Sequence, residues 1–380
     1  MLEQSGSQRT EPRAGWLRRF FRRALLRFVA RLLATDDGRR IIKDSIDGLL
    51  ARRVLLPPPA SAPYADLPAP AASPPRAAGA GPPPIFITAR FRSGSTFLWN
   101  IFRNIDGHTS YYEPLNERRW FDPSARGDRV DATHKNVEEY WREYEGLEEL
   151  GEWYREDWIR RDLYMDATSW APEMRRYIEV LVARARGRAV LQFNRVDFRL
   201  AWLRVNFPEA KILHLYRHPR DQWVSSLFRS KFPKDGTVAD FRACDHFYLL
   251  LWAQDLKYHF PFLDERAAAA AGEHPYRLFY YIWKLSYLFG REHAHFSIGF
   301  EDLVADPRAR LVEMFEAADV RGYDLDRLVA LLVKPDVGKW KEYADAAWFE
   351  RHEAECERVL ARFLGTAEPA PRAARPAPVR

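Results

Sequence analysis

Short apolar runs alternate with stretches of helical character along the middle of the chain. Runs that are short, apolar and rich in β-branched or aromatic residues are typical of buried strands, and here they are 85–88, 189–193, 211–216 and 296–300. The stretches with helical character are 96–103, 199–206, 221–228 and 308–318. This alternation predicts an α/β fold, with a parallel sheet flanked by helices and ligands bound beyond the carboxyl ends of the strands.

Two segments rich in proline and alanine bound this patterned region. Residues 57–84 and 366–380 cannot hold helices and bury little surface, so we expect an exposed linker and a disordered tail. The predicted division is therefore a basic helical arm at 1–56, the linker, one domain at 85–365, and the tail.

The arm contains a stretch, 16–34, whose apolar and basic side chains fall on opposite faces of a helix. The apolar face repeats at three- and four-residue spacing: Leu17, Phe21, Leu25, Phe28 and Leu32. The basic face carries Arg19, Arg23, Arg27 and Arg31. Such an amphipathic helix suits peripheral contact with an anionic membrane surface. Docking on the protein's own body or on a second subunit is the alternative, and the oligomeric state is left open.

Composition excludes several classes of protein. The chain has 380 residues, of which 47% are apolar and 14% aromatic, so it can bury a large core and is not a disordered protein. A net charge of +6 is small for this length and does not indicate nucleic-acid binding. Only two cysteines are present, Cys244 and Cys356, which excludes a disulfide framework and a zinc site of three or four cysteines.

The same sequence features favour a cytoplasmic location. The low cysteine count suits reducing surroundings. No apolar run reaches the length of a membrane-spanning helix. Arginines interrupt the apolar part of the N-terminal segment, which argues against a secretory signal. We therefore expect a cytoplasmic protein, whose association with a membrane would depend on 16–34.

The segment that follows the first predicted strand has a residue pattern typical of an anion-binding loop. It reads IFITARFRSGSTFLWN over 85–100, with Arg92, Ser93, Gly94, Ser95 and Thr96 between the strand and the next helix. A helix N-terminus offers free N–H groups and a partial positive charge, and glycine permits close approach of an anion. An ordinary turn with a Ser or Thr cap is the alternative.

This loop differs from a Walker A loop, because no Gly-Lys-Ser/Thr stands at its end. It therefore suits a phosphate-like group without magnesium, and we expect no metal.

A second polar segment follows the strand at 211–216. That strand leads directly into Arg217, and Ser225 lies eight residues later on the predicted helix. An arginine at a strand's carboxyl end and a serine on the next helix can hold one phosphate together. A structural arginine–carboxylate pair is the alternative.

Together, the two segments resemble those of sulfotransferases that use 3′-phosphoadenosine-5′-phosphosulfate (PAPS). The resemblance rests on RSGSTFLW at 92–99 and RHPRDQWVSS at 217–226, with support from FEDLVADP at 300–307. It implies a P-loop NTPase-like sulfotransferase fold and PAPS as the co-substrate. It also implies that Arg92, Ser93, Gly94, Ser95, Thr96 and Phe97 bind the 5′-phosphosulfate, and that Arg217 and Ser225 bind the 3′-phosphate.

The chain is more similar to carbohydrate-type and bacterial sulfotransferases than to the cytosolic branch. That branch has Lys where Arg92 stands, and a histidine base that has no counterpart in QFNRVD, residues 192–197. In the other group a Glu-Pro-Leu follows the first helix, as YYEPLNE does here at 111–117. We therefore take Glu113, after a strand ending in TSYY, as the candidate general base, and Arg92 as the group that stabilises the transferring sulfuryl.

The sequence leaves alternative assignments open for the base and for the segment that would close the donor site. His108, His134 and Asp197 are weaker candidates for the base, and Glu113 is alternatively a surface residue or a partner of Arg118. By resemblance, Gly338, Lys339 and Trp340 would close the donor site, although a plain turn between helices fits them equally well.

The acceptor suggested by the resemblance is a hydroxyl of a carbohydrate or glycolipid. Aromatic side chains are dense on the acceptor side, at 117–170 and 279–289, and we expect most of them to belong to the core. The competing functions are a P-loop-type nucleotide-dependent kinase and a non-enzymatic protein that binds membranes or polyanions.

Overall fold

The computed structural model of the protein describes residues 82–131, 134, 136–227, 230–332 and 337–365, and of the segment before residue 82 only Phe28. The basic helix expected at 16–34 (apart from Phe28), the linker up to residue 81 and the tail 366–380 therefore lie outside the described residues. The chain divides into two units, Met1–Pro57 and Pro58–Arg380, and the fold below belongs to the second.

The centre of the fold is a parallel sheet of five strands in the order β2-β3-β1-β4-β5. The strands are β1 Ile85–Ala89, β2 His108–Tyr112, β3 Arg188–Phe193, β4 Lys211–Tyr216 and β5 Phe296–Gly299. β1 is central, buried at every residue and apolar at most of them, as a strand covered on both faces requires. Ile87 of β1 stands opposite Gln192 of β3 and Leu213 of β4, so the carboxyl ends of these three strands form one edge.

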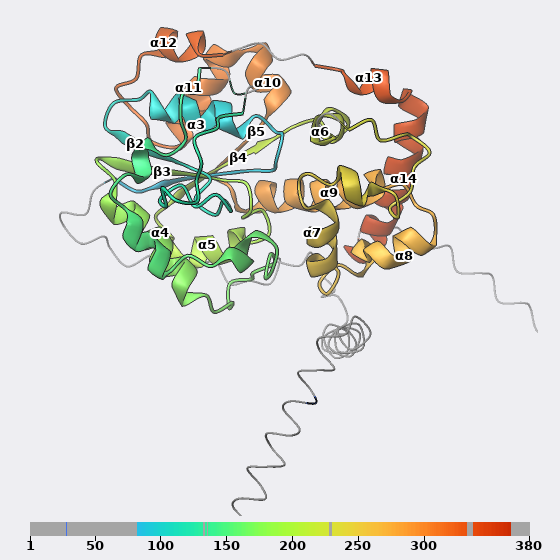
Figure 1. Ribbon diagram of the computed structural model, residues 1–380. Coiled ribbons are helices and arrows are strands. Elements are labelled where there is room, and N and C mark those ends of the chain that lie inside the picture. Colours follow the sequence, from blue (N-terminus) through green and yellow to red (C-terminus); the bar gives the residue numbers. More distant parts are fainter. Residues whose placement is uncertain are drawn as a thin grey trace, which may run out of the picture. The chain divides into compact units, whose positions relative to one another are not determined.

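Helices cover both faces of the sheet. The α-helices of the described residues are α3 Ser95–Arg103, α4 Pro172–Arg184, α5 Leu200–Asn206, α6 Pro219–Ser226, α7 Leu249–Leu256, α8 Glu265–Ala270, α9 Tyr276–His293, α10 Phe300–Ala305, α11 Pro307–Ala317, α12 Leu325–Ala330, α13 Trp340–Tyr343 and α14 Ala346–Phe363. In Figure 1, α3, α10, α11 and α12 lie above the sheet, and α4 and α5 lie below it. The expected α/β fold is therefore confirmed.

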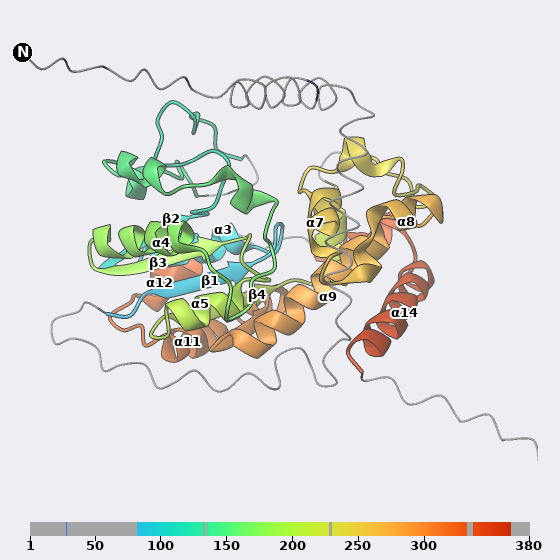
Figure 2. The same cartoon turned by 90° about the horizontal axis from the view of Figure 1, so that it is seen from below.

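Two cores correspond to these two faces. The smaller core joins one face of the sheet to α3 and α11 and includes Leu98, Phe102, Leu311 and Phe315. The larger core joins the other face to α4, α5 and α9, and α7 and α14 pack on α9 (Figure 2). The aromatic residues of α9 that are buried, such as Tyr276 and Phe289, belong to this core, in line with the expectation from the sequence.

Helix boundaries shift slightly from those expected. The helix expected at 221–228 begins at Pro219, because proline fits the first position of a helix and leaves no amide without a partner there. The strand expected at 211–216 is observed over those six residues. No helix in the described part of the chain combines the length and apolar character needed to cross a bilayer.

Candidate functional site

The loop between β1 and α3 presents a helix N-terminus at the carboxyl edge of the sheet. Gly94 occupies the N-cap with φ 94°, and its carbonyl accepts hydrogen bonds from the amides of Phe97 and Leu98. The first turn of α3 has no acidic residue, so the positive end of the helix is not neutralised from within it. The strand, turn and helix N-terminus that we expect of an anion-binding loop are therefore present, and anion binding itself stays a prediction.

The serines of this loop have different surroundings. The Ser93 hydroxyl donates to the Arg90 carbonyl oxygen at 2.6 Å and is fully buried, so it shapes the loop from inside. The hydroxyl is therefore directed into the loop in this structure, and the part of Ser93 in donor binding stays a prediction. Ser95 is also buried, whereas Thr96 is half-buried and lies 3.0 Å from the Tyr112 hydroxyl.

Gly94 is a position where a side chain is poorly tolerated. A Cβ there would stand 2.4 Å from the ring of Phe300, and the positive φ disfavours any L-residue. We expect Gly94→Ala to lower the free energy of unfolding by roughly 2–4 kcal/mol, from backbone strain plus overpacking. Urea denaturation measures this, with Gly107→Ala as the matched control, because Gly107 also has a positive φ but open space around it. Equal losses in the two variants would show that the contact with Phe300 is unimportant.

The structure brings the second polar segment into contact with the loop. Arg92 Nε donates to Ser225 Oγ at 3.1 Å, and Arg217 Nη1 donates to the Arg92 carbonyl oxygen at 3.2 Å. Arg217 comes directly after β4, and Ser225 lies near the end of α6. Two segments far apart in sequence thus form one basic group at the edge of the sheet.

One N–H group of the Arg217 guanidinium is available to bind an anion. Burial lowers its pKa, while Asp221 and Glu301 act in the opposite direction. Glu301 is 3.9 Å from Nε, and this buried Nε–H makes no hydrogen bond within the described part of the chain. The carboxylate pair considered for Arg217 is therefore present only as a long contact, and an anion bound here would satisfy the Nε–H.

Glu113 follows β2 directly and is held in a buried ion pair. Its side chain is 10% exposed, and Oε2 accepts from Asn116 Nδ2 at 2.5 Å and from Arg195 Nη1 at 3.5 Å. Its φ of 40° is unusual for a residue other than glycine. It is therefore not a surface residue, and its partner is Arg195 rather than Arg118, which donates to the Arg129 carbonyl oxygen.

His134 lies beside the anion-binding loop. Nε2 is 3.3 Å from Thr96 Oγ1, and Nδ1 is 2.6 Å from the Tyr140 hydroxyl. Burial lowers the pKa of His134 to about 4, opposed by Asp131 and assisted by the charge of Arg92. The ring is therefore neutral at pH 7, and both of its nitrogens already have neighbours.

The other two weaker candidates do not reach the site as bases. His108 begins β2, so it lies at the amino edge of the sheet, opposite the anion-binding loop. Asp197 is almost fully buried and accepts hydrogen bonds from Thr88, Arg90 and Ser286. Both of its carboxylate oxygens therefore already accept hydrogen bonds from side chains of the protein.

The segment 338–340 is attached to the helix that carries Ser225. The amides of Gly338 and Trp340 donate to the two carboxylate oxygens of Asp221, at 2.9 and 3.3 Å. The Trp340 ring stacks on His218, and the Arg220 guanidinium lies over it at 4.9 Å. The expected closing segment therefore lies against the start of α6, next to Arg217.

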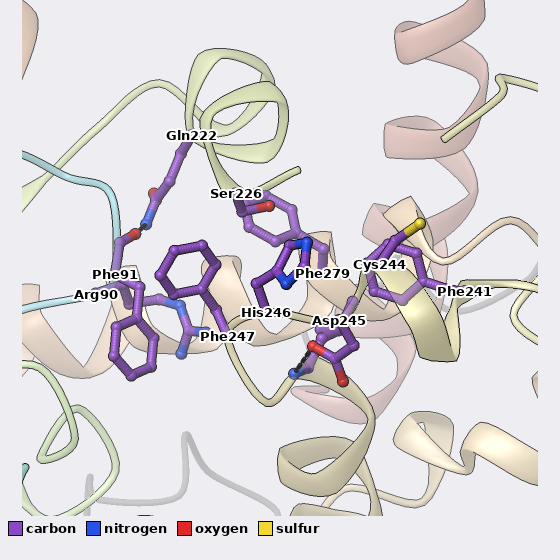
Figure 3. Close-up of a pocket in the computed structure, with 11 residues that line it drawn as sticks. Arg90, Phe91, Gln222, Ser226, Phe241, Cys244, Asp245, His246, Phe247 and Phe279 are labelled. Atoms are coloured by element: carbon purple, nitrogen blue, oxygen red, sulfur yellow. Dashed lines mark hydrogen bonds between the residues drawn. The ribbon is translucent and has the colours of Figure 1, made fainter. Parts of the chain in front are cut away.

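A small pocket lies beside Arg90 and Phe91, in the loop that follows β1 (Figure 3). Its lining comes from the loop after β1, from α6, from residues 241–249 and from α9, and includes four phenylalanines: Phe91, Phe241, Phe247 and Phe279. The Gln222 amide donates to the Phe91 carbonyl oxygen at 2.6 Å, which fixes the loop to α6. Phe247 also contacts the Arg92 guanidinium, whose centre lies 5.9 Å from the ring. The pocket therefore borders the basic group.

Comparison with known families decides what this fold is. A family model described as the sulfotransferase family matches residues 83–324. The chain belongs to the sulfotransferase family. No curated protein matches it.

Solved sulfotransferase structures give a weaker likeness. A sulfotransferase from Alicyclobacillus acidocaldarius is 16% identical, with coverage of 75% of this chain and 97% of that one and a TM-score of 0.34. Sulfotransferase STF9 from Mycobacterium avium is 14% identical over 76% and 78% of the two chains, with a TM-score of 0.40. STF1 from Mycobacterium tuberculosis H37Rv is 16% identical over 73% and 77%, with a TM-score of 0.36. The assignment therefore rests on the family model.

In this sulfotransferase, one buried residue at the site, Arg195, is absent from the candidates that the sequence analysis names. Arg195 stands two residues beyond β3 and contacts Glu113, 82 positions earlier in the sequence. A charged residue within two positions of the end of a predicted buried strand is a signal that could have identified it, as it did for Arg217. The strand order, which brings β3 next to β2, could not be read from the sequence.

Proposed function

We propose that this sulfotransferase transfers a sulfuryl group from PAPS to the hydroxyl of an acceptor. The observation that carries the proposal is the contact of Arg92 with both Ser225 and Arg217. It joins a helix N-terminus that suits one anionic group to a basic strand end that suits another. PAPS carries such a pair of groups, a 5′-phosphosulfate and a 3′-phosphate, on one nucleoside.

The proposed roles of the donor-side residues follow from their chemistry. The N–H groups at the start of α3 and the Arg92 guanidinium would bind the 5′-phosphosulfate and stabilise charge on the transferring sulfuryl. Arg217 and Ser225 would bind the 3′-phosphate, because the Arg217 Nε–H has no hydrogen-bond partner in the described residues. Gly338, Lys339 and Trp340 would cover the donor, since Asp221 fixes this segment beside Arg217.

The reaction itself is an in-line displacement at sulfur. The acceptor oxygen forms a bond to sulfur as the bond between sulfur and the 5′-phosphate oxygen breaks. The acceptor's proton goes to the Glu113 carboxylate, and the leaving group departs as 3′,5′-adenosine bisphosphate. The products are a sulfate ester and this bisphosphate, so atoms and charge balance without any further reactant.

The acceptor is proposed to be an alcohol of a carbohydrate or glycolipid. Glu113 supports a base-assisted attack by a hydroxyl, because it lies at the carboxyl edge of the sheet with Asn116 and Arg195 holding one carboxylate oxygen. The pocket of Figure 3 offers aromatic walls beside Arg92, on which an apolar part of such an acceptor can pack.

Calorimetry with two nucleotides tests the proposal. We expect 3′,5′-adenosine bisphosphate to bind with a dissociation constant on the order of micromolar and ATP with magnesium to bind at least about tenfold more weakly. The reason is that Arg217 and Ser225 suit a 3′-phosphate, which ATP lacks. Tighter binding of ATP would favour a nucleotide-dependent kinase, and binding of neither would favour a protein without this activity.

Turnover can be followed without knowing the natural acceptor. The readout is release of 3′,5′-adenosine bisphosphate from PAPS, with water alone and with octyl glucoside, which presents sugar hydroxyls on an alkyl chain. We expect octyl glucoside to accelerate the release. Tight donor binding without any turnover would contradict the proposed activity while leaving the donor assignment intact.

A further inference from the structure

Arg195 is a buried cation at the carboxyl edge of the sheet, and the proposed reaction gives it no role beyond its contact with Glu113. Its side chain is 1% exposed, and arginine is almost never buried to this extent unless it is paired. The Phe91 ring covers its guanidinium at 5.0 Å. Since Phe91 precedes Arg92, Arg195 lies directly behind the anion-binding loop.

The guanidinium is shared between two carboxylates. Nη1 donates to Asn194 Oδ1 at 2.6 Å and lies 3.5 Å from Glu113 Oε2, whereas Nη2 donates to Glu117 Oε2 at 2.5 Å. The shorter contact is therefore with Glu117. Glu117 differs from Glu113 in exposure, since its side chain is 41% exposed and its Oε1 accepts from the Tyr248 hydroxyl at 3.0 Å.

We propose that Arg195 is the positioning residue for Glu113 and that Glu117 determines how much of the Arg195 charge Glu113 receives. This inference rests on the proposed function, in which Glu113 takes the acceptor's proton. Arg195 and Asn116 hold Oε2 from two directions, which fixes the plane of the carboxylate. Glu117, on the rim of the site, draws the guanidinium away from Glu113.

The other titratable groups facing Glu113 do not compete with this effect. Tyr112 precedes it on β2, and Tyr140 and Tyr144 approach from the segment that follows. Burial raises the pKa of each tyrosine above its ordinary value of 10, so all three are uncharged at neutral pH. Arg195 and Glu117 are thus the charged groups at issue.

The test is the pH dependence of PAPS turnover in the full chain, measured with water and with octyl glucoside. A base must be ionised to act, so turnover falls on the acid side of its profile. Arg195→Gln removes a positive charge beside the carboxylate, and we expect the acid limb of the turnover profile to move to higher pH. Glu117→Gln removes a like charge and leaves Arg195 to Glu113, so the limb should move to lower pH.

Opposite shifts in these two variants are the result a purely structural role would not produce. Arg195→Lys keeps the charge without the planar fork and should give a smaller shift than Arg195→Gln with a lower maximal rate. Glu117→Gln changes a half-exposed side chain, so it keeps the test informative if Arg195→Gln does not fold. An acid limb that stays in place in Glu117→Gln and Arg195→Lys overturns the inference. Absence of turnover in the unchanged protein overturns the proposed function instead.

Discussion

Glu113→Gln is expected to lower the turnover of PAPS by roughly a hundredfold or more at neutral pH, which is the usual scale of general base catalysis. The amide keeps the shape of the side chain and can still accept a hydrogen bond from Asn116, but it cannot take a proton. Binding of 3′,5′-adenosine bisphosphate should change little, because Glu113 follows β2 whereas the donor-side residues follow β1 and β4.

A matched control separates chemistry from loss of a buried ion pair. Glu143 is also a mostly buried carboxylate bonded to an arginine, with Oε1 accepting from Arg103 Nε at 2.7 Å. Arg103 ends α3, so this pair lies at the end of the helix away from the anion-binding loop. Glu143→Gln should lower stability without the loss in turnover. If Glu113→Gln retains turnover within about threefold of the unchanged protein, Glu113 is not the base.

The fold could be predicted because its signals are local. The sequence predicts β4 residue for residue, since KILHLY is a short apolar run between a proline-containing turn and Arg217. The loop at Gly94 can also be predicted from the sequence, because a strand, a glycine with flanking serines and a helix follow each other within a few residues. The family resemblance inferred from these segments is confirmed by the match over 83–324.

The parts of the site that could not be predicted depend on strand order. β3 inserts between β2 and β1, and this brings Arg195 to Glu113 in place of the neighbour in sequence, Arg118. His134 comes to Thr96 from a segment without regular pattern, so nothing in its spacing indicated this contact. The inward bond of the Ser93 hydroxyl is likewise a property of the folded loop, since residue type alone gives no direction to a hydroxyl.

Arg217→Ala is expected to weaken binding of 3′,5′-adenosine bisphosphate by roughly a hundredfold. Each hydrogen bond to a charged group contributes about 1.5–3 kcal/mol, and about 1.4 kcal/mol corresponds to a factor of ten. The side chain is only 12% exposed, so its interactions are weakly screened by solvent. Titration calorimetry measures the effect directly and does not require an acceptor.

Two further variants test whether the loss of affinity in Arg217→Ala comes from a lost contact between Arg217 and the 3′-phosphate. Arg217→Lys keeps a charge but loses the fork, and should recover part of the affinity. Arg220→Ala, three residues later, removes an arginine whose guanidinium is bonded to both carboxylate oxygens of Glu353 at 2.7 and 2.9 Å. Since that arginine is already paired with Glu353 and reaches the proposed donor site only through its contact with Trp340, its loss should lower stability and reduce affinity for the bisphosphate far less than the loss of Arg217 does. Equal losses of affinity in Arg217→Ala and Arg220→Ala would mean that the start of α6, and not Arg217 itself, determines donor binding.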